Sequence, residues 1–153
     1  MTIYVDGSCS KNGAKINEGG FGAVIIDDDN VITLYQEREE NTTNNRQELK
    51  AILWAMKKYG QPTGGFAFIP TVYSDSSYSV NTFNEWMFNW ERKGWIKSDK
   101  KIPENLDIIQ EYFDLFKQGY RIDLRKCAGH AGNQYNELAD QLAKGEISIN
   151  ADR

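Results

Sequence analysis

The sequence predicts an α/β domain with a mixed five-stranded sheet, three antiparallel strands followed by parallel ones, and helices on both faces. Two observations lead to this prediction. Up to residue 36, short apolar runs are separated by turn-forming residues, which indicates a meander of strands. From residue 45 onward, segments of helical periodicity alternate with short strand-like runs, which favours βαβ connections and therefore parallel pairing.

Three strands are predicted in the first part of the chain. Thr2–Ser8 is a short run with apolar and β-branched residues, as expected for a buried strand. Cys9–Gly20 is polar and contains glycines, which favours a loop. Gly22–Ile26 and Val31–Gln36 are the next two strands, and the acidic segment 27–30 between them is typical of a hairpin turn.

The remaining elements are predicted from periodicity and from helix-stopping residues. Between Asn45 and Tyr59, apolar side chains recur at i, i+3, i+4 and i+7, which predicts a helix with one apolar stripe. Gly60 and Pro62 end this helix. The elements that follow are the strand Thr71–Ser74, the helices Ser76–Phe83 and Pro103–Lys117, an edge strand over Tyr120–Lys126 and the helix Asn136–Lys144.

The composition, 40% hydrophobic and 26% charged residues, is that of a soluble globular protein. We expect one domain over residues 1–146 and a loose tail over residues 147–153. No apolar run approaches the roughly 20 residues of a membrane span, and no secretory signal is visible. With only two cysteines, we expect a reducing compartment, the cytoplasm. We also expect a monomer. The net charge of −4 argues against nucleic-acid binding through the overall field alone.

Two carboxylates are predicted to meet at one edge of the sheet. Asp6 ends the first strand and Asp75 follows the fourth, and parallel neighbours place both at the carboxyl edge, where sites of open α/β sheets form. Each has a structural alternative. Asp6 is also suited to a turn before Gly7, and Asp75 to the N-cap of the next helix.

Glu48 and Asp140 are further candidates with structural alternatives. Asn45 and Glu48 fit a capping box, although Glu48 adjoins the apolar stripe and should lean toward the sheet. On the last helix, Leu138 and Leu142 share a face and Asp140 falls roughly opposite. The pattern alone therefore predicts an exposed pair between Asp140 and the lysine four residues later.

His130 is the sole histidine, and small residues flank it on both sides. Such a loop suits a general acid or base near neutral pH better than a packed core position. A surface histidine without a role is the alternative.

Five segments together resemble the type 1 ribonuclease H family over nearly the whole chain, in the family's order and at suitable spacing. The first two are Tyr4-Val5-Asp6-Gly7-Ser8 and Thr42-Thr43-Asn44-Asn45-Arg46-Gln47-Glu48-Leu49. The others are Tyr73-Ser74-Asp75-Ser76, Gly129-His130-Ala131-Gly132 and Asn136-Glu137-Leu138-Ala139-Asp140. The resemblance implies an RNase H-like fold.

The resemblance also implies an endonuclease that cuts the RNA strand of RNA–DNA hybrids and leaves 5′-phosphate and 3′-hydroxyl ends. It implies two Mg²⁺ ions, with Mn²⁺ as a possible substitute. Asp6 would bridge both ions, Asp140 would help hold the ion that activates water, and Glu48 and Asp75 would hold the ion near the leaving group. His130 would assist proton movement or product release.

Substrate contacts are implied by the same resemblance. Asn44, Asn45 and Ser77 are expected on the surface that reads RNA 2′-hydroxyls, and Asn12 and Thr43 at a DNA phosphate. Segment 86–101 resembles the family's basic protrusion: residues 91–101 hold five basic and two acidic residues, a net charge of +3. The candidates for substrate contact in this segment are Trp86, Asn89 and Lys93, whereas Trp90 is expected in the core. Asn136, outside the segment, is the last predicted substrate residue.

Two departures and two alternatives accompany this prediction. Segment 10–18 lacks the usual glycine- and proline-rich composition, and Ser77 stands where a longer amide side chain is common. The alternatives are a nuclease of the same fold that acts on DNA, and an inactive nucleic-acid-binding domain. The intact carboxylates argue against the inactive domain, because clustered negative charge beside phosphates does not help a pure binder.

Overall fold

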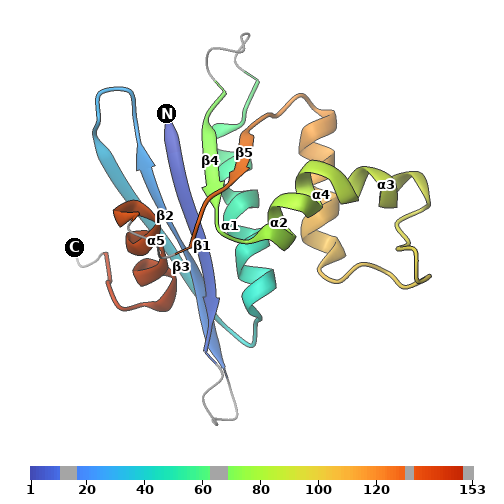
Figure 1. Ribbon diagram of the computed structural model, residues 1–153, viewed down its shortest axis with the longest axis horizontal. Coiled ribbons are helices and arrows are strands. Elements are labelled where there is room, and N and C mark those ends of the chain that lie inside the picture. The colour runs from blue at the N-terminus through green and yellow to red at the C-terminus, as the bar shows by residue number, and fades with distance from the viewer. Residues whose placement is uncertain (11–16, 63–68, 130–132, 150–153) are drawn as a thin grey trace.

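The computed structural model describes residues 1–10, 17–62, 69–129 and 133–149. Its five strands form one mixed sheet in the order β3-β2-β1-β4-β5, as predicted (Figure 1). The strands are β1 (Thr2–Cys9), β2 (Glu18–Ile26), β3 (Ile32–Glu40), β4 (Thr71–Ser74) and β5 (Asp123–Lys126). The helices are α1 (Asn44–Tyr59), α2 (Ser77–Asn81), the π-helical segment η2 (Thr82–Trp86), α3 (Met87–Arg92), α4 (Leu106–Lys117) and α5 (Gln134–Lys144).

β1 is the central strand. It pairs antiparallel with β2 and parallel with β4, and in the parallel ladder Val5 lies opposite Ser74. Ile3 and Val5 are fully buried in the larger core, which α1 and α4 also line, while Tyr4 points to the other face and packs with α5. Helices therefore cover both faces of the sheet, and α5 lies across from α1 (Figure 1).

The hairpin strands are longer than predicted. β2 begins at Glu18 and β3 continues to Glu40, although the prediction began β2 at Gly22 and ended β3 at Gln36. The glycines near residue 20 were interpreted as loop residues, but they permit close packing within the sheet. A Cβ at Gly20 would lie 2.3 Å from the Glu37 carbonyl oxygen, and Gly20 pairs with Arg38.

Helix α1 begins one residue earlier than predicted and has a different cap. Thr43 is the N-cap, and its Oγ1 accepts a hydrogen bond of 3.0 Å from the Arg46 amide. The predicted capping box with Asn45 as N-cap is therefore wrong, and Glu48 lies a full turn inside the helix. Gly60 ends α1, as predicted.

Four other boundaries also differ from the prediction. α2 continues through η2 into α3, so that Trp86 is helical. α4 begins at Leu106, beyond Pro103, because Asn105 adopts a left-handed conformation with φ of 60° just before it. α5 begins at Gln134, since the Asn133 side chain caps it by accepting from the Tyr135 and Asn136 amides. β5 is an edge strand as predicted but starts at Asp123.

The segment 147–149 is held against the sheet, contrary to the prediction of a loose tail. Gln36 Nε2 donates to the Ile147 carbonyl oxygen, and Gln36 Oε1 accepts from the Ile149 backbone N–H, both at 2.9 Å. Ile147 and Ile149 also pack on the cluster between α5 and the sheet. Residues 150–153 lie outside the described part, and the domain boundary at 146 stays a prediction. No described helix is long and apolar enough to cross a membrane.

Gly22 provides a test of how α5 docks on the sheet. A Cβ at this position would lie 2.5 Å from both the Ala139 carbonyl oxygen and the Leu142 Cβ. We expect Gly22→Ala to lower the free energy of unfolding by about 1–3 kcal/mol, because overpacking pushes α5 outward. Urea-induced unfolding measures this change.

Gly94→Ala is the matched control for this substitution. Gly94 has a φ of +78° and nothing within 4 Å of a built Cβ, so its substitution adds only backbone strain. If Gly22→Ala destabilises the protein no more than Gly94→Ala does, the packing of α5 on the sheet does not require a glycine at position 22.

Candidate active site

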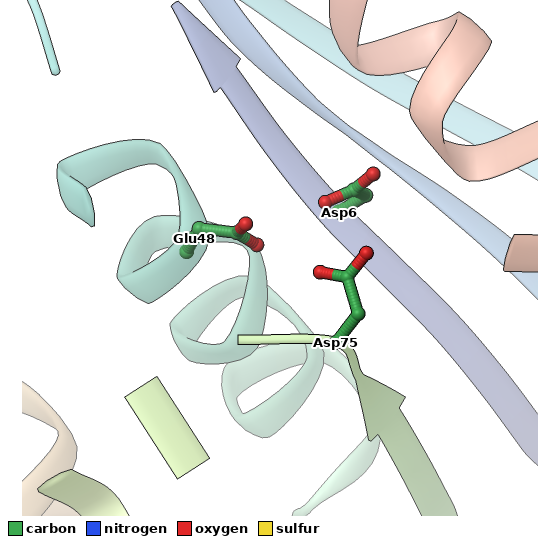
Figure 2. Close-up of side chains that lie close together, drawn as sticks. All are labelled: Asp6, Glu48 and Asp75. Carbon is green, nitrogen blue, oxygen red and sulfur yellow. The ribbon is translucent and has the colours of Figure 1, made fainter. Parts of the chain in front are cut away.

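Three predicted carboxylates converge at the carboxyl end of the central strand. Asp6 lies on β1, Asp75 immediately follows β4, and Glu48 lies on α1. Figure 2 shows the three side chains pointing toward one another from these elements. One oxygen from each carboxylate lies within 4.8 Å of the others. The predicted meeting of Asp6 and Asp75 at one sheet edge is confirmed, and Glu48 joins them.

Gly7 brings the helix close enough for Glu48 to reach this cluster. Its backbone N–H donates to Asp6 Oδ1 at 2.9 Å and to Glu48 Oε1 at 3.0 Å. A Cβ at Gly7 would lie 2.3 Å from the Glu48 nitrogen, so a side chain there would force α1 away. A turn before this glycine is the alternative role for Asp6, but β1 continues through Gly7 to Cys9. A glycine inside a strand is itself a sign of close backbone approach.

The carboxylates raise one another's proton affinity. Burial is the main cause that raises the pKa of Asp6 from its usual 3.8 to about 8, and Asp75 and Asp140 add to it. Burial also raises the pKa of Glu48, with further contributions from Asp6 and Asp75. These buried groups are therefore unfavourable as anions unless a positive charge lies between them.

Asp140 joins the cluster from α5. Asp140 lies close enough to Asp6 to add to the raised pKa of that carboxyl, and Lys144 Nζ lies 3.1 Å from Asp140 Oδ2. The predicted helix face was partly wrong. Leu142 is fully buried as predicted and Leu138 is only partly buried, but the side of α5 that packs on the sheet also holds Asn136, Ala139 and Ala143, and Asp140 borders it. The predicted pair with Lys144 exists, but the Asp140 side chain is only 16% exposed.

The donor chemistry of this site fits divalent cations. All the groups are carboxylate oxygens, which hard cations such as Mg²⁺ and Mn²⁺ prefer. Asp6 lies within reach of every other member, so Asp6, Glu48 and Asp75 could hold one ion, and Asp6 and Asp140 a second. The charge of an ion would relieve the repulsion that raises the pKa values of Asp6 and Glu48.

His130 and Asn12 lie outside the described residues. The neighbouring Gly129 is described, and a Cβ built on it would lie 3.1 Å from Asp75 Oδ2. Gly129, the residue before the predicted histidine, therefore lies directly beside the Asp75 carboxylate.

Most predicted substrate residues lie on the surface around the carboxylates. Thr43, Asn44 and Asn45 are exposed at the start of α1, within five residues of Glu48. Ser77 is exposed at the start of α2, two residues after Asp75. These positions are available for contact with a ligand.

Farther along, the aromatic residues of the predicted protrusion are half-buried. Trp86 packs against Trp90 and Tyr78, with ring centroids about 6 Å apart, and Asn89 and Lys93 are exposed. Trp90 packs against the main core, as expected, but is only partly buried. Trp86 and Trp90 also line a surface pocket of about 280 Å³.

Asn136 does not fit direct substrate contact. Its side chain is completely buried, and its Oδ1 accepts a weak hydrogen bond of 3.8 Å from the Cys127 thiol. The prediction of a substrate contact came only from the resemblance to the family. The Asn136 side chain faces inward on the side of α5 that packs on the sheet.

The fold and the acidic cluster define this chain as an α/β protein with a candidate site for divalent metal ions at the end of its central strand. The sequence model described as RNase H matches residues 1–148. The chain belongs to the RNase H family.

Curated relatives match over nearly the whole length of this chain. A ribonuclease H of Thermoanaerobacter sp. (strain X514) is 40% identical over 151 residues, covering 98% of this chain and 91% of the relative. A ribonuclease H of Chlorobaculum parvum is 37% identical over 145 residues, covering 94% and 92%.

Solved structures share the fold. LC9-RNase H1, a type 1 RNase H with the type 2 active-site motif, superposes with a TM-score of 0.70 at 28% identity, covering 94% of this chain and 70% of that one. A foamy viral protease-reverse transcriptase in complex with an RNA/DNA hybrid superposes with a TM-score of 0.81 at 22% identity, covering 94% of this chain and 19% of that one. This second likeness shows the fold alone.

The raised pKa of Asp6 predicts how stability depends on pH in the metal-free protein. The pKa of Asp6 is 3.8 in the unfolded chain, so the carboxyl loses its proton near pH 3.8. In the folded protein the pKa is about 8, so it keeps the proton up to about pH 8. Stability should therefore fall as the pH rises from about 4 to 8, because the unfolded state releases its proton first. Asp6→Asn should flatten this decline, as measured by urea unfolding in the presence of a chelator.

Asp114→Asn is the control, since Asp114 is exposed and lies outside the site. It should retain the wild-type slope of stability against pH. An equal slope in wild type and Asp6→Asn would contradict the proton affinity assigned to Asp6.

Proposed function

We propose that this protein is a metal-dependent endonuclease that cleaves the RNA strand of RNA–DNA hybrids, leaving 5′-phosphate and 3′-hydroxyl ends. The observation that carries the proposal is the convergence of Asp6, Glu48 and Asp75 within 4.8 Å, with Asp140 close enough to raise the pKa of Asp6, in a member of the RNase H family. Four carboxylates at one point suit cations and phosphoryl chemistry better than binding of a polyanion without metal.

The proposed cofactor is Mg²⁺, two ions per site, with Mn²⁺ as a substitute. Asp6 would contact both ions, Asp140 the ion that serves the attacking water, and Glu48 and Asp75 the ion at the leaving group. When bound, the two ions supply an activated water and stabilise the leaving oxygen. Asp6 must release its proton to take this role, and the Gly7 N–H keeps Asp6 and Glu48 oriented.

Residues around the cluster would bind and orient the hybrid. The exposed Asn44, Asn45 and Ser77 carry short donors and acceptors suited to 2′-hydroxyls, which distinguish RNA from DNA. Asn12 and Thr43 are proposed to hold a phosphate of the DNA strand. Trp86, Asn89 and Lys93 are proposed to contact the same strand, through an aromatic face, an amide and a charge.

Location and oligomeric state complete the proposal. We propose a cytoplasmic monomer: all four carboxylates come from one chain, so the site needs no second copy. Cys9 and Cys127 are both free, which suits a reducing compartment.

Substrate choice is tested with three labelled duplexes of the same sequence. With Mg²⁺, we expect cleavage of the RNA strand in the RNA–DNA hybrid and little or no cleavage of double-stranded RNA or DNA, because only the hybrid offers 2′-hydroxyls on one strand beside a DNA strand. The end groups are read by phosphatase and ligase sensitivity. Equal or greater cleavage of either homoduplex would refute the proposed specificity.

The role of Asp6 is tested by Asp6→Asn. This variant should lose activity by about 10³-fold or more, since it removes a charge shared by both proposed ions, while hybrid affinity remains measurable. His130→Ala should lose less, about 10²-fold, as expected for a group that assists proton movement. Asp114→Asn, on the exposed side of α4, is the control that should retain full activity. Near wild-type turnover by Asp6→Asn would exclude the bridging role.

A further inference from the structure

Lys144 is the basic residue that contacts the carboxylate cluster. Among the salt bridges between described residues, only that of Lys144 with Asp140 joins a cation to one of the four carboxylates. Its Nζ lies 3.1 Å from Asp140 Oδ2, and both residues lie on α5, one turn apart. Asp140 therefore contacts Lys144 and also lies close to Asp6.

This ion pair differs from an ordinary pair on a helix surface. In the comparable pair on α4, Lys117 and Asp114 are 3.7 Å apart and both side chains are more than 60% exposed. Asp140 is only 16% exposed, and Lys144 is 45% exposed. Partial burial reduces solvent screening, so the charge of Lys144 acts more strongly on Asp140 than the charge of Lys117 acts on Asp114.

We infer that Lys144 is a positioning residue that neutralises Asp140 in the metal-free protein and weakens cation binding on the Asp140 side of the site. This inference rests on the metal site of the proposed function. A cation that binds Asp140 must displace the ammonium group from Oδ2 and then remain near a like charge. The Asp6–Glu48–Asp75 side has no such lysine among its described ion pairs, so the two proposed ions would bind with unequal affinity.

The acidic surroundings of Lys144 agree with this role. Asp140 is the main cause that raises the pKa of Lys144, and Glu146 and Asp6 add to it. Lys144 therefore keeps its charge near neutral pH. The final turn of a helix favours any lysine, but that effect alone does not place the ammonium group on a carboxylate of the site.

The test is isothermal titration calorimetry of the full chain with Mg²⁺ alone, without nucleic acid. Lys144→Gln keeps most of the side-chain length and removes the charge, so Mg²⁺ should bind about threefold to tenfold more tightly. Lys144→Arg keeps the charge and should bind Mg²⁺ like the wild type. Lys117→Gln is the matched control, and its Mg²⁺ affinity should not change.

The double variant Lys144→Gln/Asp140→Asn identifies the route of the effect. If Lys144 acts through Asp140, the gain from Lys144→Gln disappears in the Asp140→Asn background. Unchanged or weaker Mg²⁺ binding by Lys144→Gln overturns the inference, and so does a gain that persists without the Asp140 charge. Circular dichroism and thermal unfolding establish that each variant is folded before titration.

Failure of the metal site itself gives a different result. In that case the wild type either shows no heat of Mg²⁺ binding or shows a heat that Asp6→Asn leaves unchanged. Either result refutes the proposed function and the inference together. Wild-type binding that depends on Asp6, combined with an unaltered Lys144→Gln, refutes the inference alone.

Discussion

The burial of the Asp6 carboxylate within the central strand is the constraint on which the rest of the structure depends. β1 is central because its alternating side chains serve two cores, Ile3 and Val5 on one face and Tyr4 on the other. Asp6 follows Val5 in this strand and is likewise buried, with 3% of its surface exposed. A buried carboxylate anion is unfavourable unless a bound cation or proton neutralises its charge.

The alternation of β1 also explains why the cluster draws on both faces of the sheet. Asp6 lies two residues after Tyr4 and therefore on the α5 face, where Asp140 meets it. Gly7 points to the α1 face, and its lack of a side chain lets α1 approach until Glu48 shares the Gly7 N–H with Asp6. Two successive residues of one strand thus join helices on opposite sides of the sheet.

Strand order and the cluster at the sheet edge were predictable because they follow from large, regular signals. The switch from hairpin to βαβ connections placed β1 beside β4, and this brought Asp6 and Asp75 together. Strand ends near glycines were not predictable from local sequence, since Gly20 and Gly22 occupy strand positions only because a partner packs closely on them.

Asp140 shows where single-sequence patterns stop being informative. The spacing of Leu138 and Leu142 centred the predicted buried face on the two leucines, because large apolar residues dominate such a pattern. In the structure Leu142 is buried but the packed face also includes Ala139 and Ala143, next to which Gly22 leaves space for the helix. Only the resemblance to a family identified Asp140, and no local signal in the sequence identified Lys144 as more than a surface partner.

The parallel register of β1 and β4 links correct folding to a correct site. Asp75 comes from a strand about 70 residues away from Asp6, and Val72 on the same strand is fully buried. A slip of one residue would turn every side chain of β4 to the opposite face. Val72 would then leave the core at the same moment as the acidic end of the strand lost its alignment. Misregistered chains therefore lack core stability as well as the cluster, and the hydrophobic core itself selects the chains in which the carboxylates meet.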